Sequence, residues 1–348
     1  MQKKLIALAV ASMLTAPAFA QTNVKIYGSL DALFATFTND GASTNLDDST
    51  HKTSRLGFQG EEDLGGGLKA FFQLEERFFL DTATVDGKYR FKDKAWVGLK
   101  GGFGEVSFGR VPTVMDRVYG GGKIAQIDTI ADVANRRAEA DTRVDNGISY
   151  VSPKFGPVTL YAHTAVKEAN KGKTPLGIAA NATFGPAFVE AGWQKDGVAD
   201  GTPNTSVQAV TNLLVSSTTN HVQNQYKTWS LNGGYKFTGF SLYAGYFQSK
   251  AYDQPYAATR LNKHVRYALG AEAKVGANGG LYATLSQGKR EQFNGVDQNT
   301  YTKLGVAYQH NLSKRTQLIT AASFERQDNA FAGEDQRIGL QAGLRHAF

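Results

Sequence analysis

The chain has 348 residues, of which 41% are apolar, 20% charged and 11% aromatic, with 38 glycines, 8 prolines and no cysteine. Mean hydropathy is −0.34, and no apolar run approaches the roughly 20 residues of a membrane-spanning helix, which excludes a helical membrane protein. Without cysteine there is no disulfide framework, so the fold must be held by packing or hydrogen bonding.

The N-terminal residues have the features of a secretory signal peptide. Lys3 and Lys4 precede an apolar stretch at 5–14, and Ala18-Phe19-Ala20 is a small-residue cleavage site. We therefore expect residues 1–20 to be a signal peptide and residues 21–348 to form a single mature domain. The net charge of +7, less the two lysines of the leader, leaves +5 for that domain. In an exported protein, this basic surplus fits anionic lipids or small anions and argues against nucleic acid as a partner.

Most of the remaining sequence alternates between apolar and polar residues, the pattern typical of β-strands. In the first such segment Val24, Ile26, Leu30 and Phe34 alternate with polar neighbours. Similar alternation occurs at 68–75, 228–237, 264–274 and 337–348. Convincing amphipathic helices are nearly absent. The sequence therefore predicts an all-β fold, although alternation alone does not separate a soluble sandwich from a membrane barrel.

The connections between the predicted strands separate the two. Seven are short and mostly glycine-rich: 63–67, 101–104, 153–157, 184–187, 237–240, 275–280 and 311–314. Longer polar stretches take turns with them: 38–52, 81–89, 112–142, 168–174, 197–225, 252–261, 292–297 and 329–334. Such regular alternation of short and long connections is typical of an up-and-down barrel that has short turns at one end and long loops at the other. Seven turns and eight loops join sixteen strands.

A barrel of this kind satisfies the main physical requirement of a membrane. Hydrocarbon offers no water to the backbone N–H and C=O groups, so a spanning sheet can have no free edge. Joining the first strand to the last removes both edges. We therefore predict a transmembrane antiparallel β-barrel of 16 strands. A barrel of that size encloses water, whereas one of eight strands is filled by its own side chains.

Several ordered stretches resemble the general porins of Gram-negative bacteria, in the branch found in Neisseria and betaproteobacteria. They are Ile26-Tyr27-Gly28, the SRLGF run at 54–58, EDLGGGLKA at 62–70, VGL at 97–99, GFG at 102–104, Gly109-Arg110, NGISY at 146–150, YQHNLSKRT at 308–316 and GLRHAF at 343–348. The resemblance spans the whole mature chain. It implies an outer-membrane homotrimer without cofactors, in which loop 3 folds into the lumen of each barrel and small hydrophilic solutes pass by diffusion.

The predicted loop at 112–142 carries the charges expected at a constriction. Gly120-Gly121-Gly122 gives its backbone freedom, and the apolar spacing beyond predicts a short helix around 128–138. Candidate pore residues within the loop are Asp116, Asp132, Arg136 and Arg137.

Strand parity selects the cations that should face this loop. If Leu56 and Phe58 face lipid, then Arg55 faces the lumen, and the same alternation places Arg90, Lys92, Lys94 and Arg143 inside, with Asp145. In the porin branch that this chain resembles, arginines at the positions of Arg55 and Arg143 line the constriction, and Lys94 substitutes for a third cation. These inward-facing cations predict a channel that prefers anions among the small solutes it passes.

Catalytic readings have little support in the sequence. The six histidines are scattered without the spacing of a metal site, and neither a nucleophile elbow nor a phosphate-binding loop is present. Two alternatives to a general diffusion porin remain open. One is a channel dedicated to an anionic nutrient such as an organic carboxylate, and the other is a structural or adhesive barrel.

The C-terminus predicts how the chain reaches the membrane. Phe348 ends a strand with Leu340, Ala342 and Leu344 on the same face. This pattern resembles the signal that the outer-membrane insertion machinery reads. We therefore expect that machinery, outer-membrane lipids and lipopolysaccharide among the partners of the chain.

Overall fold

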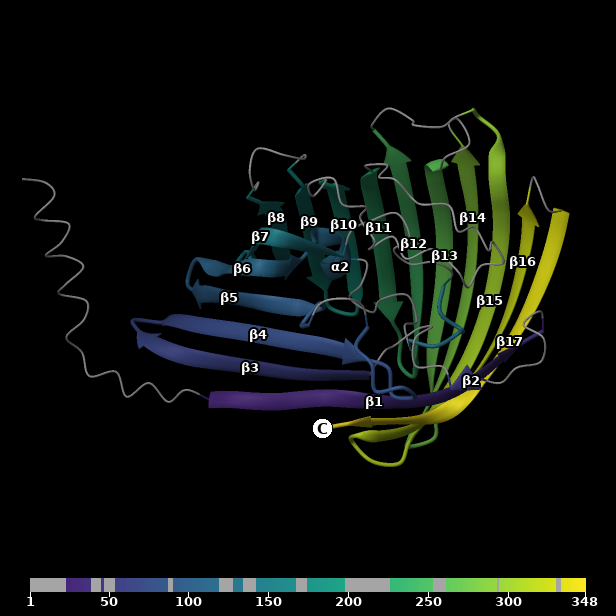
Figure 1. The fold of residues 1–348 in the computed structure, drawn as a ribbon, viewed down its shortest axis with the longest axis horizontal. Coiled ribbons are helices and arrows are strands. Elements are labelled where there is room, and N and C mark those ends of the chain that lie inside the picture. Colours follow the sequence, from purple (N-terminus) through teal and green to yellow (C-terminus); the bar gives the residue numbers. More distant parts are fainter. Residues whose placement is uncertain are drawn as a thin grey trace, which may run out of the picture.

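The computed structural model describes residues 23–38, 45–46, 54–86, 90–118, 128–133, 142–166, 174–197, 226–252, 261–292, 294–329 and 333–348. The predicted signal peptide, 1–20, lies outside the described residues. The strands form one sheet that curves round on itself (Figure 1). Across the described ranges, no helix is long and apolar enough to cross a membrane.

The sheet contains seventeen strands, one of which is only two residues long. In chain order they are β1 (Asn23–Phe37), β2 (Asn45–Leu46), β3 (Ser54–Gly65), β4 (Leu68–Phe78), β5 (Lys94–Gly101), β6 (Gly104–Pro112), β7 (Arg143–Val151), β8 (Val158–Ala165), β9 (Leu176–Phe184), β10 (Ala187–Lys195), β11 (Tyr226–Lys236), β12 (Phe240–Ala251), β13 (Leu261–Val275), β14 (Gly279–Gln292), β15 (Asp297–Asn311), β16 (Thr316–Asn329) and β17 (Gly333–Ala347). One short helix, α2 (Val114–Val118), follows β6.

Apart from the short β2, which pairs with β1, sixteen strands run antiparallel round the barrel, as predicted. All seven predicted short turns are confirmed, because each joins two strands that pair with one another; β7 and β8, for example, flank residues 152–157. The strand ends that the predicted long connections join lie at the opposite end of the barrel from the short turns. Glycines at the short turns have positive φ, as at Gly65, Gly156, Gly185 and Gly276, a conformation that L side chains disfavour.

The first and last strands close the barrel. β1 pairs antiparallel with β17 from Ser29–Ala347 to Phe37–Gly339, and the two strands lie side by side in Figure 1. At the end of the ladder, the backbone N–H of Gly28 donates to the carbonyl of Phe348 at 3.1 Å, and the Phe348 N–H donates back to Gly28 at 3.1 Å. Closure therefore reaches the C-terminal residue.

The two faces of the sheet have opposite chemistry. On β13, Tyr267 and Leu269 are 60% and 55% exposed, whereas His264 and Arg266, at the alternate positions of the strand, are 0% and 1% exposed. The same inversion occurs on β1, where Ile26 and Phe34 are exposed and Asp31 is buried. Large apolar side chains on the outside and charged side chains on the inside are expected of a sheet surrounded by lipid.

The facing assignment can be tested by depth. Leu269 lies near the middle of β13, and Leu281 lies on β14 close to the short turn between β13 and β14. Both point outward. Leu269→Arg should lower the free energy of unfolding by about 2–4 kcal/mol, because it places a cation at mid-membrane depth, and Leu281→Arg should lower it far less. Reversible folding into vesicles measures both. Equal losses for the two variants would contradict the assignment.

Candidate functional site

The helix α2 is anchored by acceptors at each of its first three backbone N–H groups. Thr113 Oγ1 accepts from Asp116 N at 3.3 Å, the usual N-cap arrangement. His163 Nδ1, on β8, accepts from Val114 N at 3.0 Å, and Gln194 Oε1, on β10, accepts from Met115 N at 3.4 Å. Two of the three acceptors belong to the barrel, so the barrel itself positions the helix.

Packing holds α2 against the inner face of β8–β11 as well. Val114, Met115 and Val118 are buried with Ala179 and Phe247. A Cβ at Gly192, on β10, would lie 2.8 Å from Met115 Cε and 2.9 Å from Val118 Cγ2, so the glycine makes room for the helix. Figure 1 shows α2 within the curve of the sheet.

In a second part of the same connection, residues 128–131 lie against the inner face of β14–β17, on the opposite side of the barrel from α2. Ile130 and Ala131 are buried with Ala307 and Ala321, on β15 and β16. The Ile130 N–H donates to Gln341 Oε1 at 3.2 Å, and the Thr284 hydroxyl donates to the carbonyl of Ala131. The described parts of the connection therefore contact inward-facing residues on both sides of the barrel.

The helix predicted around 128–138 is wrong over its described part. Residues 128–133 form turns and a bend, and the helix lies instead at Val114–Val118. Apolar spacing misled here, because Ile130, Ala131 and Val133 each pack on a barrel strand and not on a common helical face. The predicted pore residues Arg136 and Arg137 lie outside the described residues. Asp132 is described and is 1% exposed.

Glu75, on β4, is one centre of an ion-pair cluster on the inner face. It is 1% exposed and receives Arg55 Nη1 at 3.3 Å and Lys94 Nζ at 3.0 Å. Its second oxygen also accepts from the Tyr27 hydroxyl at 2.8 Å. Ladder pairing brings these groups together, since Glu75 lies directly opposite Lys94.

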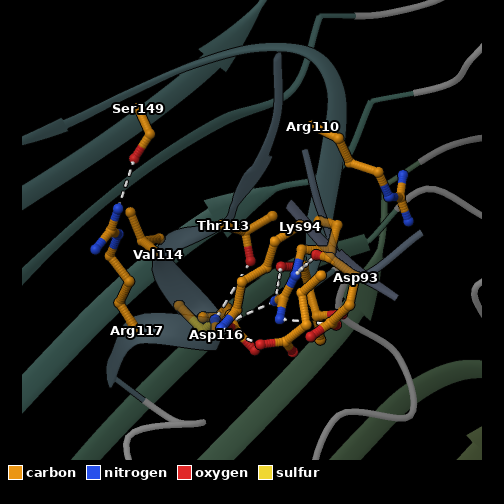
Figure 2. Close-up of polar contacts among 12 residues, drawn as sticks. Asp93, Lys94, Arg110, Thr113, Val114, Asp116, Arg117 and Ser149 are labelled. Atoms are coloured by element: carbon orange, nitrogen blue, oxygen red, sulfur yellow. Dashed lines mark hydrogen bonds and ion pairs between the residues drawn. The ribbon is translucent and has the colours of Figure 1, made fainter. Parts of the chain in front are cut away.

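Asp93 is the second centre of the cluster. Arg77 Nη2 lies 2.6 Å and Arg143 Nη2 3.1 Å from Asp93 Oδ1, and Arg143 Nη1 reaches Asp116 Oδ2, on α2, at 2.7 Å. Figure 2 shows Asp93, Lys94 and Asp116 gathered together, with Arg110 pointing away. Burial alone would raise the pKa of Asp93, but Arg143 and Arg77 hold it well below its ordinary value. Asp93 is therefore charged at neutral pH.

The two centres form one ion-pair cluster. It contains four cations and three carboxylates, a net charge of +1: Arg55, Arg77, Lys94, Arg143, Glu75, Asp93 and Asp116. The structure thus brings together four residues predicted from the sequence: Arg55, Lys94, Arg143 and Asp116. Glu75, Arg77 and Asp93 were missed. Arg77 and Glu75 could have been predicted from the alternation of β4, because residues two apart share a face and both lie on the inner one.

Arg117 extends the charged region from α2 toward β7. Its Nη2 donates to Ser149 Oγ at 3.2 Å, and the guanidinium lies 5.8 Å from the centre of the Tyr161 ring. Figure 2 shows Arg117 and Ser149 joined in this way, on the side of Asp116 away from Arg110. Burial lowers the pKa of Arg117.

Three other residues that strand parity predicts on the inner face lie outside the ion-pair cluster. Arg90 pairs with Glu76 at 3.0 Å with its side chain 72% exposed, and Lys92 pairs with Asp86 at 3.2 Å. Both lie before β5 begins at Lys94, where alternation has no meaning, so neither joins the ion-pair cluster. Asp145 pairs with Arg110 instead of entering the cluster, because the β6–β7 register shifts between Gly109 and Val111.

A second set of inner-face cations, on β13–β17, was also missed. Lys303, Glu325 and Arg337 lie directly opposite one another on three consecutive strands. Arg266 packs over the Phe247 ring at 5.0 Å, and Arg290 over the Tyr301 ring at 5.8 Å. We refer to these five residues as the β13–β17 group; it holds four cations and one carboxylate. The described ranges hold no cluster of histidine and carboxylate side chains suited to a metal ion.

Comparison with known proteins identifies this architecture. The sequence model of the Gram-negative porins matches residues 7–330. The chain belongs to the Gram-negative porin family. It is 31% identical to outer membrane porin protein 32 of Delftia acidovorans over 388 aligned positions that cover all of both chains, and 26% identical, again end to end, to major outer membrane protein P.IB of Neisseria meningitidis.

Solved structures agree. The anion-selective porin from Comamonas acidovorans superposes with a TM-score of 0.72 at 25% identity, over 94% of this chain and 100% of the other. OmpF of Salmonella typhi shares the fold at 13% identity, with a TM-score of 0.65 over 93% of this chain and 97% of the other. The chain is therefore an outer-membrane porin, a passive channel and not an enzyme.

Seating of residues 128–133 can be tested at Gly305. A Cβ there would overlap the backbone of Ala131, so Gly305→Val should push the segment away from β15 toward the barrel axis and lower the single-channel conductance. Gly233→Val is the control, because a Cβ at Gly233 meets no atom closer than 3.3 Å. Planar-bilayer recording compares the two. The same conductance in both variants would show that the segment does not rest on β15.

Proposed function

We propose that this porin forms a water-filled channel for passive diffusion of small hydrophilic solutes and prefers anions. The observation that carries the proposal is the excess of positive charge on the inner face. The ion-pair cluster holds four cations against three carboxylates, and the β13–β17 group holds four against one. The likeness to a porin described as anion-selective supports the same preference.

The pairing of the cluster defines how selectivity would arise. Arg55 and Arg143 are not bare charges, because buried carboxylates hold each of them in place. Fixed cations keep their position as solutes pass, and salt at about 0.1 M screens charges beyond roughly 10 Å. Only the charges lining the narrowest passage should therefore bias the permeant, and the net charge of the whole domain should matter little.

The contacts of the connection between β6 and β7 support a position for that passage. The described parts of the connection contact β8–β11 on one side and β14–β17 on the other. We propose that this connection, loop 3, crosses the lumen and narrows it beside the ion-pair cluster. Asp116 links the two directly through Arg143.

Assembly and export belong to the same proposal. We propose a homotrimer, which the trimer form among the solved structures of similar fold supports. Residues 1–20 would be removed on export, leaving 21–348. The partners would be small anionic solutes, outer-membrane lipids, lipopolysaccharide and the insertion machinery that reads Phe348.

Selectivity can be tested with substitutions of opposite sign. Arg55→Gln combined with Arg143→Gln should move the reversal potential toward cations, and Glu75→Gln should move it toward anions, more strongly at low salt. Lys227→Gln with Lys263→Gln, both on the outer face, removes the same charge without touching the lumen. Single-channel recording in a salt gradient measures all three. A shift by the outer-face pair as large as that of Arg55 and Arg143 would refute the constriction.

The same recording separates a general porin from a dedicated channel. Current through a diffusion porin should rise in proportion to solute concentration. Saturation and block by one organic carboxylate would show that the basic inner face binds a particular nutrient.

Phe348 can be tested separately from pore chemistry. Its ring lies over Gly28 on the outer face, where it is 41% exposed. Phe348→Ala should lower the yield of membrane-inserted protein in cells, while Phe348→Tyr should retain it. Refolding of the purified variants into vesicles is the control, because no insertion machinery is present there. An unchanged yield of Phe348→Ala in cells would remove the assignment.

A further inference from the structure

Four lysines form a row across the outer face of the barrel, at the rim that carries the long connections. Lys195 lies directly opposite Lys227, Lys227 opposite Lys250, and Lys250 opposite Lys263. They belong to four consecutive strands, β10–β13. Each lies an even number of residues from an outward side chain of its own strand, such as Trp229 for Lys227 and Leu269 for Lys263, so all four point outward. We call these four residues the lysine row.

Like charges directly opposite in an antiparallel ladder repel, so such a row needs a counter-charge. The described residues do not supply one: no lysine of the row forms an ion pair with them, although Glu291 lies opposite Lys263 at one end. Lys195 and Lys227 instead place their ammonium groups 5.0 and 5.5 Å from the centre of the Tyr252 ring. The ring steadies two members of the row and neutralises neither.

Other outward cations at the same rim are paired. Lys289 Nζ lies 2.9 Å from Asp297 Oδ2, and Arg326 Nη2 lies 2.8 Å from Glu334 Oε2. These pairs are on β14–β17, next to the lysine row around the barrel. Among the described residues, these exposed cations on β14–β17 therefore have carboxylate partners, and the lysines of the row on β10–β13 do not.

Depth in the membrane identifies what the row faces. Trp193 and Trp229, the next outward residues along β10 and β11, are opposite one another with ring centres 6.1 Å apart. Tryptophans on a lipid-facing surface mark the boundary between acyl chains and headgroups. Two residues further along a strand is about 6–7 Å, which brings the ammonium groups to headgroup level. In barrels of this class, the rim with long loops is extracellular.

From this arrangement we propose that the lysine row is a binding site for the phosphate groups of lipopolysaccharide in the outer leaflet. The lipid phosphates supply the counter-charge that the row lacks, and the acyl chains lie along the apolar surface below Trp193 and Trp229. The site deepens the lipid partnership proposed above by naming its residues. It rests on the outer-membrane location of the porin and is independent of the selectivity of the pore.

Purified full-length porin in detergent, titrated with bisphosphorylated lipid A, tests the site, with dephosphorylated lipid A as the second probe. Lys227→Gln with Lys250→Gln should weaken binding about thirtyfold (about 2 kcal/mol), since each lysine near an anionic lipid surface contributes about 1 kcal/mol. Lys289→Gln with Arg326→Gln removes the same charge from paired positions on the same rim and should change the affinity less than threefold. Lys227→Arg with Lys250→Arg should retain binding.

Two results would overturn the proposal: equal weakening by the two glutamine pairs, or equal affinity of the unmodified protein for lipid A and its dephosphorylated form. Single-channel conductance of each variant shows that the barrel is intact. Because the lysines lie outside, an unchanged reversal potential beside weakened lipid binding separates this site from the selectivity proposal. If the lipid-binding proposal or the selectivity proposal is contradicted, the other one is unaffected.

Discussion

The structure depends on the hydrogen bonding of its backbone in a medium without water. A spanning sheet must pair every strand on both sides, and the ladder between β1 and β17 meets that requirement by ending in the reciprocal bonds of Gly28 and Phe348. Once the sheet closes, the alternation of each strand acquires a fixed meaning. One set of side chains faces lipid, the other faces the interior, and the chemistry of each set follows.

Charge in the interior is stabilised by pairing, which gives the site its rigidity. Arg55 and Arg77 lie directly opposite one another on β3 and β4, an arrangement that would repel without carboxylates. Glu75 pairs with Arg55 and Asp93 pairs with Arg77, and Asp116 links Arg143 to α2. The connection after β6 is thus bound to the barrel by ion pairs, by capping from His163 and Gln194, and by apolar contacts at Ile130 and Ala131.

Much of this could be predicted from the sequence, because turns and alternation are local signals. The seven short turns and the outward faces of β1 and β13 are examples. The inner apolar residues Leu33 and Ile319, each 1% exposed, were not predictable, because their burial depends on closure and on what packs inside the barrel. Strand parity led to Arg55 and Lys94, which lie within strands and belong to the ion-pair cluster, whereas Arg90, which precedes a strand, lies outside the cluster. Glu75 and Asp93 emerge as partners only when strand register is known.

The central claim, that β1 closes on β17 in the observed register, can be measured directly because the chain has no cysteine. Ser29 and Ala347 are ladder partners, whereas Lys25 lies four residues from Ser29 along β1. The account predicts that Ser29→Cys with Ala347→Cys forms a disulfide in the outer membrane, and that Lys25→Cys with Ala347→Cys does not. Cross-linking of the second pair but not the first would contradict this closure and every facing assignment that depends on it.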